Sequence, residues 1–175
     1  MNSEQADIPS SAFDHELNEA LVNADIANGY EEFLAIFDRF YAEQVEVASD
    51  HHATGLVGKS SVLPVLFNFL VPLHVMAEIG GLAVTLRYST IHSDKRGEQH
   101  AEWSLDLLGI LGRRVTLHWS SVRRWKDAHV VYEHHYEHRQ IGEPLTLIDL
   151  EFSAPSPRSE HKSDRCPTRH KRKSQ

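Results

Sequence analysis

The chain has 175 residues, of which 41% are hydrophobic and 25% are charged, and its formal net charge at pH 7 is -7. This size suits one domain with a real core, and this composition is typical of a globular protein rather than a disordered one. Residues 1–152 carry 11 basic and 23 acidic side chains, whereas residues 153–175 carry seven basic and two acidic side chains. Because an acidic domain repels phosphate and anionic lipid, we expect no membrane partner, and nucleic-acid contact only through the basic tail.

The two ends of the chain differ from the part between them. Residues 1–10 contain no Lys or Arg and no apolar stretch, so they do not resemble a secretory signal, and we expect a flexible N-terminus and a cytoplasmic protein. Residues 153–175 are rich in Ser, Pro and basic residues and should form a disordered tail, which leaves residues 11–152 as the domain. The single cysteine, Cys166, excludes an internal disulfide and a cysteine-based zinc site.

Two amphipathic helices open the predicted domain. The first begins near the capping residue Ser11, and its apolar residues repeat at helical spacing to Ala24. Asn28-Gly29 interrupts the pattern. The second helix begins near Tyr30, and its predicted buried face consists of Phe33, Ile36, Phe37, Phe40 and Tyr41.

A short strand and a third helix follow. Residues 45–50 alternate weakly and predict a strand, after which residues 51–58 form a loop. Ser61 caps a third predicted helix, which Pro72 should end or kink. The apolar run 62–77 is interrupted by polar residues and prolines and is shorter than the roughly 20 residues needed to span a bilayer, so it predicts a buried helix lying on a sheet.

The remaining domain predicts an antiparallel meander. The apolar period changes to two, and candidate strands cover residues 82–92, 98–110, 115–125 and 129–138. Their connections are short, which requires antiparallel neighbours because a parallel crossover needs a dozen or more residues. The fold class is therefore α+β, with two or three helices followed by an antiparallel sheet.

Two segments resemble the nuclear transport factor 2-like superfamily, which includes ketosteroid isomerases and SnoaL-like polyketide cyclases. The segment Phe40 to Asp50 is similar to its helix-end and first-strand segment, and Trp125 to His138 is similar to its closing hairpin. The resemblance implies a cone: a strongly curved antiparallel sheet with helices in its concave face and a pocket at its open end. Members include cofactor-free isomerases, cyclases and dehydratases as well as non-catalytic binding or dimerisation modules, and both alternatives stay open here.

One departure from the isomerase pattern concerns the general base. Aligning the first-strand segment places Ser49 where ketosteroid isomerases have their aspartate, and Asp50 follows one residue later. A one-residue shift in a strand points the side chain to the opposite face of the sheet. The isomerase reaction itself is therefore not implied.

The last strand is rich in histidine, and its residues divide between two faces. Tyr132, His134, Tyr136 and His138 share one face with Val130, and the other face carries His135 with two glutamates. A two-residue turn at Asp127-Ala128 would place His134 opposite Ser121, Tyr136 opposite Trp119, and Glu137 opposite His118. We predict that the Tyr132 face lies on the concave side of the sheet.

An aromatic pocket with one acid/base group is the resulting hypothesis. His134, assisted by Asp50 and the phenol of Tyr136, would move protons on a small, flat, apolar or aromatic carbonyl compound. Its binding surface would consist of Trp103, Trp119 and Tyr132. The competing interpretation is that these side chains only pack the sheet.

Two alternatives concern the other face and a metal ion. His118 opposite Glu137 resembles the histidine and acid used by SnoaL-like cyclases, although so charged a face is typical of a solvated or subunit-facing surface. His134 and His138 would lie about 13 Å apart along a regular strand and cannot share one ion, so we expect no metal and no cofactor. The amphipathic meander favours a homodimer through the convex face.

Overall fold

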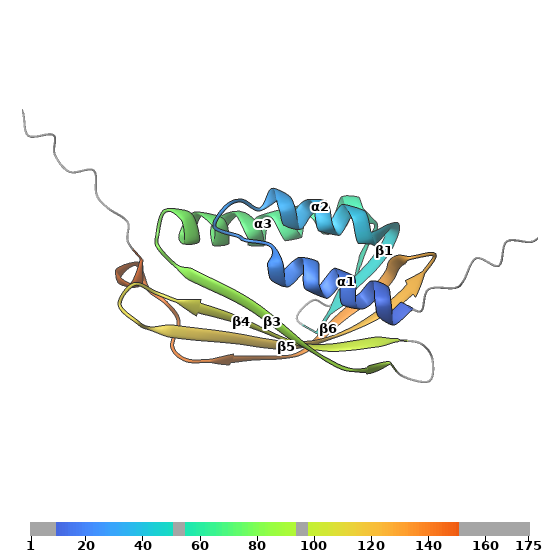
Figure 1. The fold of residues 1–175 in the computed structure, drawn as a ribbon. Coiled ribbons are helices and arrows are strands. Elements are labelled where there is room, and N and C mark those ends of the chain that lie inside the picture. The colour runs from blue at the N-terminus through green and yellow to red at the C-terminus, as the bar shows by residue number, and fades with distance from the viewer. Residues whose placement is uncertain (1–9, 51–54, 94–97, 151–175) are drawn as a thin grey trace, which may run out of the picture.

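The structure is a computed structural model that describes residues 10–50, 55–93 and 98–150. Within them, helices cover one face of a curved, open sheet (Figure 1). The elements in chain order are α1 (Ser10–Asn23), α2 (Glu31–Phe40), β1 (Tyr41–Ser49), β2 (Leu56–Val57), α3 (Lys59–Glu78), β3 (Ala83–Ser93), β4 (Gln99–Leu108), β5 (Arg114–Lys126), β6 (His129–Ile141) and the 3-10 helix η1 (Leu147–Asp149). The predictions for the N-terminus, for the loop histidines 51 and 52 and for the basic tail lie outside the described residues.

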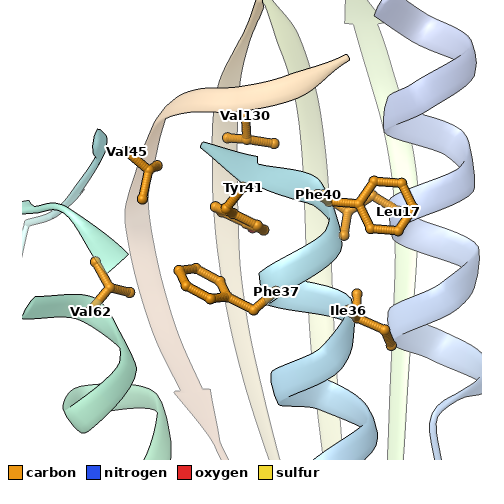
Figure 2. Packing of buried hydrophobic residues seen from close by; sticks show 8 residues of the cluster. All are labelled: Leu17, Ile36, Phe37, Phe40, Tyr41, Val45, Val62 and Val130. Atoms are coloured by element: carbon orange, nitrogen blue, oxygen red, sulfur yellow. The ribbon is translucent and has the colours of Figure 1, made fainter. Parts of the chain in front are cut away.

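The first two helices form where their apolar spacing predicts them. Ile36, Phe37 and Phe40 are buried on α2 and belong to one cluster with Leu17 of α1, and Figure 2 shows Phe40 beside Leu17. Acidic residues occupy the first turn of α2 and Arg39 its last turn, which complements the helix dipole. These contacts form one of two hydrophobic clusters. The other joins α3 to the meander through buried aliphatic side chains.

The antiparallel meander of β3, β4, β5 and β6 is confirmed, but the sheet as a whole is mixed. Its strand order is β2-β1-β6-β5-β4-β3, and β1 runs parallel to β6 from the Tyr41–Val130 pair to the Ser49–His135 pair. The prediction of a purely antiparallel sheet was therefore wrong for the β1–β6 pair. A parallel neighbour is possible there because α3 and the four strands β2 to β5 separate β1 from β6 in the chain.

Helix α3 is longer than predicted. It begins at Lys59 and continues past Pro72 to Glu78. Both of its prolines, Pro64 and Pro72, are exposed, so water can satisfy the carbonyl that each proline leaves without an amide partner. By length and composition alone, α3 is the one described helix that could cross a membrane. In this fold it lies over the sheet and buries Val62, Leu70, Leu73 and Ala77.

The two-residue turn between β5 and β6 is confirmed, whereas the predicted pairing beyond it is not. Asp127 and Ala128 both have positive φ, and Trp125 pairs with Val130 as expected. One residue further, Arg124 pairs with Tyr132. Val131 is thus an extra residue on β6, which defines a β-bulge.

Candidate functional site

The bulge at Val131 reverses the faces of β6 relative to the prediction. Beyond it, Arg123 pairs with Glu133, Ser121 with His135, and Ser120 with Tyr136. A second shift follows at Glu137, whose φ is 56°, and His118 then pairs with Arg139. Because an extra residue exchanges the two sides of a strand, Glu133 and His135 take the side that we had assigned to Tyr132 and His134.

A large cavity lies between the helices and the concave face of the sheet. Its volume is about 1020 Å³, which is at the upper end of the range for small-molecule sites. Most of its wall is apolar and comes from all three helices and the strands β1 to β6. Trp103 and Trp119, which we had predicted as ligand-binding residues, line it, and their stacked rings have centroids 6.0 Å apart. Their rings therefore form part of the wall without filling the space.

Three of the polar residues in the cavity wall, Tyr41, Arg123 and Glu133, belong to a buried network centred on Arg123. Arg123 Nε donates to Glu133 Oε1 (2.7 Å), and its Nη1 contacts Asp14 Oδ1 (3.4 Å) and donates to the Asn18 side chain. Tyr41 donates its hydroxyl to the second oxygen of Glu133 (2.6 Å). All five side chains are buried, so the network joins α1 and the start of β1 to the middle of the sheet.

The charge states of this network follow from burial and from its internal pairing. Burial opposes ionisation of Glu133, but the Arg123 guanidinium outweighs it and, with His135 and Tyr41, holds the pKa of Glu133 well below its usual value. Burial and the adjacent Glu133 charge raise the pKa of Tyr41 well above its usual value. Glu133 is therefore a carboxylate at neutral pH, and Tyr41 is a neutral hydrogen-bond donor.

His135 connects this network to the cavity. Its Nε2 lies 3.1 Å from Glu133 Oε1, its side chain is 33% exposed, and it lines the cavity. A carboxylate accepts but cannot donate, so the neutral imidazole must carry its proton on Nε2. The Nδ1 nitrogen is then the basic position. A His-carboxylate pair of this kind can accept and return a proton.

The predicted pair of His134 and Asp50 forms, but it forms outside the cavity. His134 Nε2 lies 2.8 Å from Asp50 Oδ1, and the Asp50 side chain is 53% exposed. Tyr136 lies beside His134, with ring centroids 5.7 Å apart. The guanidinium carbon of Arg124 lies 4.2 Å from the centroid of the Tyr132 ring. None of these four predicted site residues lines the cavity, so the predicted orientation of the strand was wrong, for the reason that the bulge supplies.

The alternative pair of His118 and Glu137 is not a direct cross-strand pair, since His118 lies opposite Arg139. Glu137 accepts a hydrogen bond from Ser120 (3.2 Å). Both alternative residues border a small polar recess of about 40 Å³, which is large enough for a water molecule. His118 also reaches the edge of the large cavity.

Sequence reasoning missed the residues that give the cavity its polarity. Arg123, Glu133 and His135 were visible only as charged residues of predicted strands, and Asp14 only as an acid in the first helical turn. The one available signal was that the middle of β5 and β6 carries opposite charges at positions that would pair if the register moved by one residue. In the described part of the chain, no group of three or more His, Cys, Asp or Glu side chains is placed to hold a metal ion.

Solved structures are similar to this chain in fold. A candidate polyketide cyclase from Xanthomonas campestris pv. campestris aligns with 73% of this chain and 89% of its own, at 14% identity and a TM-score of 0.50. A nuclear transport factor 2-like protein of unknown function from Cytophaga hutchinsonii aligns with 71% of this chain and 96% of its own, at 11% identity and a TM-score of 0.49. No protein-family model matches the sequence, and no curated protein matches it. On the order of its elements and on the likeness to the Xanthomonas structure, the chain has the nuclear transport factor 2-like fold.

Proposed function

We propose that this SnoaL-like chain binds a small apolar or aromatic molecule in its cavity and acts on it by cofactor-free acid/base catalysis. The observation that carries the proposal is the contact between His135, which lines the cavity, and the buried carboxylate of Glu133. This arrangement suits an isomerase, cyclase or dehydratase, because each of these reactions moves a proton next to a carbonyl group.

Each member of the pair has a distinct task in this proposal. His135 Nδ1 removes a proton from the carbon beside a carbonyl group and returns it at another position, while Glu133 holds the ring and stabilises the imidazolium that forms in between. Arg123 and Tyr41 keep Glu133 ionised and fixed. A well-placed acid/base group of this kind contributes a rate factor of about 10² to 10⁴.

The apolar cavity wall supports the proposed class of ligand. Trp103 and Trp119 present flat surfaces, and Phe37 and Phe69 line the cavity from the helical side. Such a wall binds rings and aliphatic chains through burial, at roughly 25 cal/mol for each Å² of apolar surface. The few polar groups then fix the orientation of the ligand.

A non-catalytic binding module remains the second candidate. The observation that favours it is the extent of the apolar wall. A carrier of apolar molecules needs this volume and no proton transfer. Removal of the His135 imidazole distinguishes the two candidates, because it should abolish proton transfer by an enzyme and leave a binding module unaffected.

The experiment compares two neighbouring histidines. Apolar carbonyl compounds that raise the melting temperature identify ligands, since a ligand that binds only the folded state stabilises it. NMR in D₂O then follows deuterium incorporation beside the carbonyl of each bound compound. His135→Gln should slow the protein-catalysed incorporation by about 10² to 10⁴ and change binding little.

His134→Gln is the matched control, because His134 also contacts a carboxylate but lies outside the cavity. We expect His134→Gln to catalyse deuterium incorporation at the wild-type rate. Ligand binding without protein-catalysed exchange would favour the binding module. Loss of exchange in His134→Gln but not in His135→Gln would return the catalytic role to our sequence prediction of His134 and Asp50.

A further inference from the structure

A row of polar side chains runs along β6 on the concave side of the sheet. Glu133 and His135 begin the row, and His138 and Gln140 continue it toward the end of the strand. All four residues line the cavity. Exposure rises along the row, from the buried Glu133 through the two partly exposed histidines to the exposed Gln140. One edge of the mostly apolar cavity is therefore polar.

The irregularity at Glu137 is what places His138 on this side of the sheet. The strand pairs before and after it leave Glu137 and His138 together opposite the single residue Trp119, which defines a second β-bulge. The positive φ of Glu137, 56°, belongs to this bulge. In a regular strand His138 would share the outer face with His134, and the extra residue brings it to the cavity wall beside Trp119.

The two histidines of the row are spaced for one small chemical group between them. His135 lies opposite Ser121 and His138 opposite Trp119, and these two partners are two residues apart on β5. The histidine backbones are therefore about 6.5 to 7 Å apart, and side chains on one face of a strand project in the same direction. A contact of about 3 Å from each ring leaves space for a few atoms, which is the size of a carbonyl group with its neighbouring carbon.

The two imidazoles can take opposite roles toward such a group. Glu133 fixes the proton of the neutral His135 ring on Nε2, which leaves Nδ1 as the acceptor. Nδ1 of His138 is buried, so Nε2 is the nitrogen that a ligand can approach. In the tautomer that carries its proton on Nε2, the His138 ring is a donor. One ring thus accepts a proton and the other donates a hydrogen bond.

We propose that His138 binds the carbonyl oxygen of the ligand, while the carbon next to that carbonyl lies at His135. This inference rests on the acid/base function proposed above and adds the residue that orients the substrate. The substrate class is then a flat ketone with a hydrogen-bearing carbon directly beside its carbonyl group, held against Trp119.

The proton transfer balances within this pair of histidines. His135 Nδ1 takes the proton from the carbon beside the carbonyl group. The electron pair of the broken C–H bond forms a C=C bond, and the carbonyl π pair moves onto the oxygen. The N–H group of His138 stabilises the negative charge that develops there, because a hydrogen bond to a charged acceptor is stronger than one to a neutral acceptor. Return of the proton from His135 completes the reaction.

Two probes of nearly the same shape test the role of His138 on the full chain. α-Tetralone is a flat bicyclic ketone, and tetralin has the same skeleton with a methylene group in place of the carbonyl. His138→Phe removes the N–H group and keeps a flat ring. It should lower the affinity for α-tetralone about three- to tenfold and leave the affinity for tetralin unchanged, as measured by NMR titration. His138→Gln keeps an N–H donor and should retain most of the affinity for α-tetralone.

His134→Phe is the matched control, because His134 belongs to the same strand but lies outside the cavity. It should bind both probes like the wild type. The carbon-13 signal of the carbonyl in bound α-tetralone is a second readout, since a hydrogen bond to the oxygen moves it downfield. This displacement should be lost in His138→Phe alone. In D₂O, His138→Phe should also slow deuterium incorporation into α-tetralone by about 10² to 10³.

Three binding results would overturn the proposal. The first is no binding of α-tetralone to the wild type, and the second is an unchanged affinity for it in His138→Phe. The third is an equal loss for both probes in His138→Phe, because His138 would then act through its shape alone.

The binding results do not depend on turnover, so the two proposals can fail separately. Binding of α-tetralone that depends on His138, without any exchange, would contradict the acid/base function and support the carbonyl site. Exchange that depends on His135 but not on His138 would overturn the carbonyl site and leave the acid/base function in place.

Discussion

Glu133 is an ionised carboxylate in a largely apolar interior, and its neighbours explain why it stays charged. An isolated buried charge costs several kcal/mol, but Glu133 has a guanidinium, a phenol and an imidazole as partners. Asp14 and Asn18 hold Arg123 from the other side. Each residue of the network therefore positions the next, and His135 is the member that faces the cavity.

A second carboxylate, Asp106, allows a pH prediction on the outer face of the sheet. It accepts hydrogen bonds from Arg114, Thr116 and Arg87, which together lower its pKa from the ordinary 3.8 to about 2. A carboxyl with a lowered pKa stabilises the folded state above its unfolded pKa, and this contribution is lost as the pH falls from about 4 to about 2.

Asp106→Asn should therefore lower the free energy of unfolding by about 2 kcal/mol near neutral pH and by much less near pH 2. Urea unfolding of both proteins over this pH range measures the difference. Asp38→Asn is the control, since Asp38 pairs with Lys59 while its side chain is 77% exposed, and it should change stability little. If Asp106→Asn changes the free energy of unfolding equally at all pH values, the lowered pKa of Asp106 is contradicted.

At the scale of elements, the two-residue turn of the β5–β6 hairpin holds a residue with a Cβ in a left-handed conformation. The turn residue Ala128 has φ of 62°, a conformation that costs a residue with a Cβ about 1 to 2 kcal/mol. Ala128→Gly should therefore raise the free energy of unfolding by about 0.5 to 1 kcal/mol, after the greater entropy of glycine in the unfolded chain is counted. Equilibrium urea unfolding measures this gain.

The reverse substitution provides the control for this turn. Gly112 has φ of 82°, and a Cβ added there would meet no other atom within 4 Å. Gly112→Ala should therefore lose about 1 kcal/mol through backbone strain alone. If Ala128→Gly also loses stability, the strained turn is not a feature of the folded protein.

The elements also show what local patterns can predict. The helices α1 and α2 and the four strands of the meander lie close to their predicted ranges, because helical and alternating periods involve neighbours within a few residues. The turn at Asp127 and Ala128 follows from the gap between two alternating segments. The bulge at Val131 has no such signal. Because of this bulge, His135 lines the cavity in place of His134, one residue from the predicted position.

At the scale of the whole molecule, the outer face of the sheet is polar and carries both signs of charge. Arg87, Arg114 and Arg124 lie there with Glu98 and Asp106. Such a mixed surface can pair with itself in a symmetric dimer. We keep our prediction of a homodimer through this face.

Arg124→Glu should disrupt this dimer, because it reverses a charge and removes the stacking of Arg124 on Tyr132. Sedimentation velocity at high micromolar concentration should show a wild-type dimer and a mainly monomeric variant. Arg39→Glu, on α2 and exposed, should remain dimeric. A wild-type protein that sediments only as a monomer would remove the prediction.

The sequence alone determined the helices, the meander and the tight turn, because each depends on periodicity and backbone preference within a short segment. It also placed Trp103 and Trp119 on the cavity side, since β4 and β5 pair without interruption at these two residues. Only the tertiary structure decided the parallel contact of β1 with β6, the inward face of β6, and the network that joins Asp14 to Arg123, 109 residues away. These features depend on which distant segments pack together, and one extra residue in a strand is enough to exchange its two faces.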